Sequence, residues 1–403
     1  MSGAIAAVFF HNLLKEKNNL ILSFVISMIA MHLAGSVFAA RNQIFSFLIF
    51  ELEIYGLIGL LEQGKKRYFW FLILVAFLLV LFHDTLYLLY FLLAMPYLGD
   101  FILSKLFHIE NLHKFENSNL QNIKYLIILL VLSVPIGFCT PIFASTYTNL
   151  INCMNGVSAT FINELKPVNI IQDTNLLTIT FLVIGMIGFT KTKFKIKDIL
   201  FVLGLLLFAM MAGRNVYFLY LIGLIYFTNM LTACMNTYIG EERVETFWGI
   251  IEKSTFVIVV TTCFIAIVSI KNLIYQFVKE YVNDIYYPKQ ATEWILKNAD
   301  YENMRIWTHF NWGSYLELNG IKVFLDSRSG MYTEQENKGC NVLSDWLLVE
   351  NGNSDYKEIF EKYQITHVLV ENSSNLNRSL SEDSHYQVIY QDNLYVLYEK
   401  EGF

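Results

Sequence analysis

Charged residues are scarce in this chain of 403 residues, and their scarcity argues against an ordinary water-soluble protein. Only 16% of the residues are Asp, Glu, Lys or Arg, and the mean hydropathy is +0.43. Soluble domains usually carry about 25% charged residues. Together with 33 Phe and 24 Tyr, this composition places most of the chain in lipid.

Other signals are missing as well. The five cysteines form no Cys-x-x-Cys pair and no metal-ligand spacing, so we interpret them as small core residues. A net charge of -6 argues against nucleic-acid binding. The first residues lack the basic segment and cleavage site of a signal peptide. The C-terminal part holds neither a glycine-rich phosphate loop nor a Gly-x-Ser-x-Gly motif.

Apolar runs follow one another up to about Lys271, and a mixed, soluble-type sequence follows. A spanning helix needs about 20 apolar residues. The pattern predicts about nine transmembrane helices: Leu20–Ala39, Ile44–Leu61, Tyr68–Phe82, Thr85–Ile102, Tyr125–Thr140, Asn175–Thr190, Ile199–Gly213, Val216–Cys234 and Phe256–Ile270. We therefore expect a multi-pass α-helical membrane bundle over 1–271 and a soluble α/β domain over 272–403.

Lysine and arginine are distributed unevenly between the breaks in these runs. Alternate breaks carry Lys15, Lys17, Lys65, Lys66, Arg67, Lys105, Lys114, Lys124, Lys191, Lys193, Lys195, Lys197, Arg243 and Lys253. The opposite breaks carry only Arg41, Lys166 and Arg214. Because cytoplasmic loops are enriched in these residues, we expect a cell-membrane protein whose C-terminal domain is extracytoplasmic.

The few ionisable residues at the outer edge are candidates for function. Arg41 and Arg214 either extend to lipid headgroups or hold a lipid phosphate, for which a guanidinium is well suited. Glu51 lies inside an apolar run and is expected to face the bundle interior, as a partner of one of these arginines. Asp84 either caps the next helix or acts as a base.

The break over 141–173 is long, and long loops are often functional. Its apolar residues at helical spacing suggest a surface-lying or re-entrant segment, although a plain lid on the bundle explains them too. Glu164 is its only carboxylate before Asp173, and Lys166 is its only basic residue.

Helical and strand patterns alternate in the C-terminal domain and end in a hairpin, which is typical of a small α/β layer domain. Predicted helices cover Pro288–Asn298, Asn341–Glu350 and Tyr356–Tyr363, and predicted strands cover Met304–His309, Val323–Asp326, Thr366–Val370, Tyr386–Tyr390 and Leu394–Tyr398. Trp312 and Tyr315 either form a sugar-stacking surface or belong to the core. Asp326 and Arg328 form either a structural ion pair or part of a substrate site.

Several of these motifs, taken in order, resemble a largely uncharacterised bacterial membrane family grouped with the GT-C-type glycosyltransferases. They are Arg41-Asn42-Gln43, Thr140-Pro141, Asn163-Glu164-Leu165-Lys166-Pro167, Ala212-Gly213-Arg214-Asn215, Trp312-Gly313-Ser314-Tyr315-Leu316 and Phe324-Leu325-Asp326-Ser327-Arg328. GT-C enzymes carry an acidic motif in their first external loop. The resemblance implies that this chain lacks the family's N-terminal helix pair and that loop.

The resemblance implies a transferase that takes a sugar from a polyprenyl-phosphate donor at the outer face and passes it to an envelope glycan or protein. Such chemistry needs a carboxylate, here Glu164 or Asp84, and cations on the phosphate, here Arg41, Arg214 and Lys166. Trp312, Tyr315, Asp326 and Arg328 are the candidate substrate-binding residues. No cofactor is indicated, although a divalent metal is compatible with this chemistry. The alternative is a non-catalytic membrane-anchored protein that binds envelope glycan or lipid.

Overall fold

The computed structural model describes residues 1–38, 43–105, 114–140, 146–148, 162–254, 274, 286–332, 334, 339–352 and 355–402. The chain divides into two compact units, Met1–Thr262 and Cys263–Phe403. The expected boundary at 271 falls within residues 255–273, outside the described residues.

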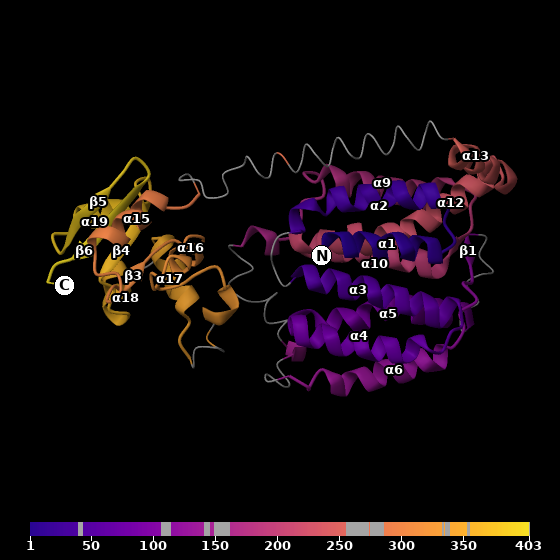
Figure 1. The fold of residues 1–403 in the computed structure, drawn as a ribbon, viewed down its shortest axis with the longest axis horizontal. Helices are drawn as coiled ribbons and strands as arrows, with labels where there is room; N and C mark the ends of the chain where they lie inside the picture. Colours follow the sequence, from indigo (N-terminus) through magenta and orange to yellow (C-terminus); the bar gives the residue numbers. More distant parts are fainter. Residues whose placement is uncertain are drawn as a thin grey trace. The chain divides into compact units, whose positions relative to one another are not determined.

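The first unit is a helical bundle whose main helices run side by side (Figure 1). Its helices are α1 (Ser2–Lys15), α2 (Leu20–Leu33), α3 (Gln43–Leu57), α4 (Tyr68–His83), α5 (Tyr87–Lys105), α6 (Ile123–Ile136), α9 (Thr174–Phe189), α10 (Ile196–Met211), α11 (Val216–Phe218), α12 (Leu224–Ile239) and α13 (Glu241–Lys253). The short turns are η1 (Gly35–Val37), η2 (Ile58–Glu62), η3 (Asp84–Leu86), η5 (Asn163–Leu165), η6 (Gly213–Asn215) and η7 (Leu219–Gly223), and a small parallel pair joins β1 (Phe115–Glu116) to β2 (Phe194–Lys195).

Three helical stretches in the described residues are long and apolar enough to cross a membrane: Gln43–Glu62, Tyr68–Lys105 and Gly213–Ile239. The expectation of nine spanning helices is not supported. Apolar helices such as Leu20–Leu33 and Ile123–Ile136 have 14 residues each. At 1.5 Å per residue they reach about 21 Å, short of a hydrocarbon layer of about 30 Å. The ninth expected span, Phe256–Ile270, lies outside the described residues.

The second of these stretches folds back on itself. His83 leaves helical geometry with φ -159° and ψ 72°, and η3 follows at once. The Tyr90 hydroxyl donates a hydrogen bond to the Leu72 carbonyl at 3.1 Å. In one straight helix these residues would lie about 27 Å apart along the axis. Tyr68–Lys105 is therefore a helical hairpin of α4 and α5 that turns at His83.

The basic breaks meet at one end of the bundle. There the Lys197 ammonium lies 2.7 Å from Glu16, 2.8 Å from Glu62 and 3.5 Å from Asp198, and its side chain is fully buried. Lys197 begins α10, Glu16 follows α1 and Glu62 ends η2. An ammonium buried among apolar helices requires such partners, because an unpaired buried charge is very costly.

Neutral polar groups complete this Lys197 cluster. Asn229 of α12 donates to Glu16 at 2.9 Å and to Asp198 at 3.2 Å. The Tyr97 hydroxyl of α5 donates to Glu62 at 3.2 Å. The cluster therefore joins α1, α5, α10, α12 and the end of α3 through their polar side chains.

The second unit is an α/β domain with helices α15 (Lys289–Asn298), α16 (Gly313–Leu318), α17 (Val342–Glu350), α18 (Tyr356–Lys362) and α19 (Asn375–Ser381), and the turn η8 (Ser329–Tyr332). Its strands are β3 (Ile306–Trp307), β4 (His367–Glu371), β5 (Tyr386–Gln391) and β6 (Tyr395–Lys400), in the order β3-β4-β6-β5. The predicted helices Pro288–Asn298, Asn341–Glu350 and Tyr356–Tyr363 and the closing hairpin are confirmed. Val323–Asp326, expected as a strand, forms only a parallel bridge between Val323 and Ile306.

Strand alternation builds the two faces of this sheet. Ile306 and Leu369 pack on one face with Ala291, Ile295 and Leu316. On the other face the Trp307 ring stacks on Phe324 and meets Phe360, with ring centroids 4.6 Å and 4.8 Å apart.

Glu350 ends α17 beside the fully buried Trp307. The Trp307 Nε1–H donates to the Glu350 carboxyl at 3.3 Å. Burial raises the pKa of Glu350 to about 7, and the nearby Glu371 adds to the shift.

The Lys197 cluster generates a stability prediction. Lys197→Met removes the cation and leaves Glu16 and Glu62 buried beside each other. Breaking a buried ion pair in this way costs about 3–5 kcal/mol. Denaturant unfolding in detergent should show this loss, whereas Lys193→Met, at an exposed position of the same segment, should stay close to the wild type. Equal stability of the two variants would contradict the structural role.

Glu350 generates a prediction about pH. Its folded pKa of about 7 exceeds the ordinary value of 4.5, so the folded state binds the proton more tightly than the unfolded state. The resulting stabilisation is complete below about pH 4.5 and is lost as the pH rises through 7. It amounts to up to about 3 kcal/mol.

The measurement is the difference in unfolding free energy between the wild type and Glu350→Gln at a series of pH values, since other titrations cancel in that difference. The exposed Glu358→Gln serves as the matched control. A flat profile for Glu350→Gln would contradict the assignment.

Candidate functional site at the Arg214 end of the bundle

A polar cavity of about 190 Å³ opens at the end of the bundle opposite the Lys197 cluster. It is lined by Gln43, His83, Leu86, Glu164, Arg214, Asn215 and Phe218. These residues begin α3, end α4, and belong to η3, η5, η6 and α11. The cavity is therefore formed where several helix ends converge, and segments more than 170 positions apart in the chain contribute to it.

Backbone contacts hold the Glu164 segment against the Arg214 turn. The Gly213 N–H donates to the Lys166 carbonyl at 3.0 Å, and the Val168 N–H donates to the Met210 carbonyl at 3.1 Å. A Cβ atom at Gly213 would lie 3.4 Å from the Glu164 carbonyl oxygen. The Gly213 turn is thus in van der Waals contact with the Glu164 backbone, and the two backbone hydrogen bonds bring Glu164 and Arg214 to the same cavity.

His83 lies at the centre of the charged groups of this site. Its Nδ1 lies 2.7 Å from the Ser46 hydroxyl, which fixes the orientation of the ring. The imidazole interacts electrostatically with both Asp84 and Arg214. One guanidinium, one imidazole and two carboxyl groups therefore gather at this end, counting Glu164 in the cavity wall.

Several predicted site residues come together here. Arg214 and Glu164 line the cavity, and Asp84 lies beside His83. Lys166 contributes a backbone carbonyl to the packing of η6 but is not among the cavity-lining residues. Arg41 lies outside the described residues.

Reading the sequence did not identify Ser46 as a partner of His83. A serine three residues into an apolar helix was the available signal, but its partner is 37 positions away. The sequence shows Gln43 only as part of the Arg41-Asn42-Gln43 motif, and the structure places this residue in the cavity wall.

Glu51 was expected to pair with Arg41 or Arg214; Arg41 lies outside the described residues, and the structure does not show the pairing with Arg214. Glu51 faces the interior as predicted and is fully buried, but its partner is Asn12 of α1. The Asn12 amide donates to the Glu51 carboxyl at 2.8 Å and to its carbonyl at 3.0 Å. Glu51 lies two turns, about 12 Å, beyond Gln43 along α3, where Asn12 of α1 supplies a donor.

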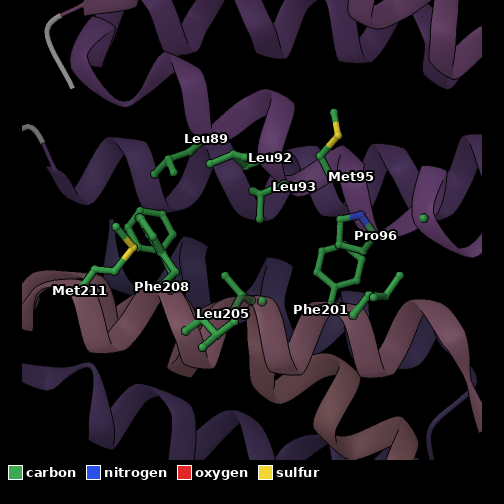
Figure 2. A pocket seen from close by; sticks show the side chains of 14 residues that line it. Leu89, Leu92, Leu93, Met95, Pro96, Phe201, Leu205, Phe208 and Met211 are labelled. Atoms are coloured by element: carbon green, nitrogen blue, oxygen red, sulfur yellow. The ribbon is translucent and has the colours of Figure 1, made fainter. Parts of the chain in front are cut away.

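An apolar groove of about 460 Å³ lies between α5 and α10 (Figure 2). Side chains of the two helices face each other across it, among them Leu93 and Pro96 from α5 and Phe201 and Leu205 from α10. Gly204 in its lining leaves room that a larger side chain would fill, whereas Leu200 already occupies the space beside Gly99. Phe218 lines both the groove and the Arg214 cavity, so the apolar and polar sites adjoin.

The candidate residues of the second unit have structural partners. Trp312 is 4% exposed and packs edge-on against Tyr395 at 5.0 Å, so the idea of a sugar-stacking Trp312 is wrong. It fails because the position lies on the buried face of the turn after β3. Tyr315 is half-buried beside Tyr287, with ring centroids 5.3 Å apart.

Asp326 and Arg328 form an ion pair that also includes Glu317, at 2.8 Å from the guanidinium. Although burial opposes it, hydrogen bonding from Arg328 holds the pKa of Asp326 below its ordinary value. A Cβ atom at Gly313 would lie 2.2 Å from the Leu325 carbonyl. The Trp312-Gly313 and Leu325-Asp326 motifs are therefore packed directly against each other.

Within the described residues, no group of three His, Cys, Asp or Glu side chains is arranged to hold a metal ion. The chain matches no protein-family model and no curated protein.

Proposed function

We propose that this chain is an integral membrane protein that binds a lipid-linked phosphate at the Arg214 end and transfers a sugar from it, as a GT-C-like glycosyltransferase with a polyprenyl-phosphate donor. The observation that carries the proposal is the junction at Phe218, where a polar cavity with a guanidinium meets an apolar groove. An amphiphile with an anionic head and a long apolar chain has the matching shape and polarity.

Each part of the site has a chemical task in this proposal. The Arg214 guanidinium donates two parallel hydrogen bonds to a phosphate and offsets its charge. The groove between α5 and α10 takes the first part of the isoprenoid chain, where burial of apolar surface favours binding. The Arg214 end lies at the headgroups of the outer leaflet in this proposal, since the basic breaks lie at the other, cytoplasmic end.

Glu164 is the proposed base. An acceptor hydroxyl attacks the anomeric carbon of the donor, and its proton passes to the Glu164 carboxylate. The bond between the anomeric carbon and the phosphate oxygen breaks, and the phosphate leaves with the electron pair beside Arg214. Asp84, next to His83, is the second carboxylate that this end offers for the same task.

The proposal includes a multi-pass topology with the second unit outside the cytoplasm. The three long apolar helices support membrane insertion. The side is inferred from charge, since Lys15, Lys65, Lys114 and Lys191 belong to breaks at the Lys197 end, and lysine-rich breaks stay in the cytoplasm.

A non-catalytic protein that binds envelope glycan or lipid is the second candidate. The compact Asp326–Arg328–Glu317 network favours it, because the polar motif of the second unit serves the packing of that unit. The two functions differ in one respect: only the transferase needs the Glu164 carboxylate.

Arg214 generates the binding prediction. Arg214→Gln should weaken the binding of polyprenyl phosphate to the protein in nanodiscs at least about tenfold, since charge-assisted hydrogen bonds are stronger than neutral ones. Arg243→Gln, at an exposed position in α13, is the matched control. Polyprenol without phosphate should bind equally weakly to all three proteins.

Glu164→Gln separates the two functions. In a transferase it keeps lipid binding but loses sugar transfer. In a binding protein neither the wild type nor the variant transfers sugar. Equal affinity of the wild type for polyprenyl phosphate and polyprenol would refute phosphate recognition altogether.

The topology is tested by single cysteines in a background with all five native cysteines replaced by serine. Glu382→Cys and Lys193→Cys both lie at exposed positions. An impermeant thiol reagent on intact cells should label Glu382→Cys only. Labelling of Lys193→Cys alone would invert the proposed orientation.

A further inference from the structure

The sheet of the second unit has a topological switch point between β3 and β4. These strands are parallel neighbours, with Ile306 opposite His367 and Trp307 opposite Val368. After β3 the chain enters α16, whose Leu316 packs on the Ile306 face. After β4 it enters α19, which contacts α17, the helix that packs beside Trp307 on the other face. In open α/β sheets, ligands bind outside the carboxyl ends of strands at such a point.

Polar residues gather at this edge. Thr308 and His309 follow β3, Glu371 ends β4, and Asn372 comes next. Glu371 acts electrostatically on both His309 and Glu350, so the three titratable groups are neighbours. His309 lies between the Trp312 and Trp346 rings, at 5.1 Å and 5.6 Å.

Two buried oxygen atoms at this edge lack a hydrogen-bond partner. They are Oγ1 of Thr308, a residue with 0% exposure, and Oδ1 of Asn372. Most buried polar atoms in native proteins are hydrogen-bonded, and an unpaired one is costly. Both atoms lie directly after the two strands that define the switch point, where a bound ligand would supply the missing partners.

The chemistry of the edge selects for ligands that donate hydrogen bonds. Glu350, Glu371 and the Asn372 Oδ1 are acceptors. The His309 Nδ1 accepts from the Asn311 N–H at 3.3 Å, so this nitrogen carries no proton. Burial also lowers the pKa of His309. The donors at this edge are the His309 Nε2–H, the Thr308 hydroxyl and the Glu350 carboxyl in its protonated form.

We propose that the carboxyl edge of β3 and β4 is a saccharide site, in which Thr308, His309, Glu371 and Asn372 hold the hydroxyl groups of a sugar. The proposal rests on the proposed function and deepens it, because it gives the second unit a ligand of the chemical class on which a sugar transferase acts. An amino sugar also donates hydrogen bonds, and the experiment below distinguishes neutral sugars from amino sugars.

Thr308→Val gives the sharpest test, because valine keeps the shape of threonine and removes only the hydroxyl. The full chain in nanodiscs is titrated with the methyl glycosides of glucose, mannose, galactose and N-acetylglucosamine, and with glucosamine, by saturation-transfer NMR. At least one neutral glycoside should bind. Thr308→Val and Glu371→Gln should each weaken that binding at least fivefold, while Thr308→Val keeps or raises the melting temperature.

Thr292→Val is the matched control. Thr292 is equally buried in the same unit, but its hydroxyl donates to the Pro288 carbonyl at 2.7 Å. This variant should lower the melting temperature and leave sugar binding intact. Wild-type binding by Thr308→Val, or the absence of binding by every glycoside, would overturn the proposal. If only glucosamine binds, the proposal of a neutral sugar is overturned, and the site recognises an ammonium group instead.

The Arg214→Gln variant distinguishes the sugar site of the second unit from the lipid site of the first. It should lose polyprenyl-phosphate binding but keep sugar binding. Sugar binding without any lipid binding in the wild type would leave the edge site standing and remove the transferase.

Discussion

The burial of the Lys197 ammonium is the constraint on which the bundle depends. A cation in an apolar interior must be surrounded by carboxylates, and Glu16, Glu62 and Asp198 reach it from three different parts of the chain. Two helices with apolar side chains can pack in many relative positions, whereas the ion pairs of Lys197 form in only one of them. The cluster thereby sets how far α1, α3 and α10 extend relative to one another.

The candidate site follows from that alignment at the other end of the same helices. Once α3 and α10 are placed, Gln43 and the Arg214 turn lie at the opposite end, and the reversal at His83 brings a third helix end to them. The apolar groove arises between α5 and α10, where Gly204 leaves space. Polar and apolar surfaces then meet at Phe218, which is what an amphiphilic ligand requires.

In the second unit, the polar side chains that stabilise the fold are different from those proposed to bind a ligand. Asp326, Arg328 and Glu317 satisfy one another, and Gly313 locks the two aromatic and acidic motifs together. The side-chain oxygens Thr308 Oγ1 and Asn372 Oδ1 have no hydrogen-bond partner within the described residues. The Trp312-Gly313 and Asp326–Arg328 motifs therefore stabilise the fold of the unit. Thr308 after β3 and Asn372 after β4 instead have side-chain oxygens that can accept a hydrogen bond from a ligand.

The sequence by itself predicted the membrane character, the change to a soluble-type sequence, most elements of the second unit and the grouping of the basic breaks, because hydropathy, periodicity and charge are local properties. It also identified Arg214, Glu164 and Asp84 as residues of one end. Only the tertiary structure decided that Glu51 pairs with Asn12, that Trp312 is buried, and that His83 contacts Ser46. Such partners depend on how distant segments pack, and a pattern along one chain carries no measure of the distance between its helices.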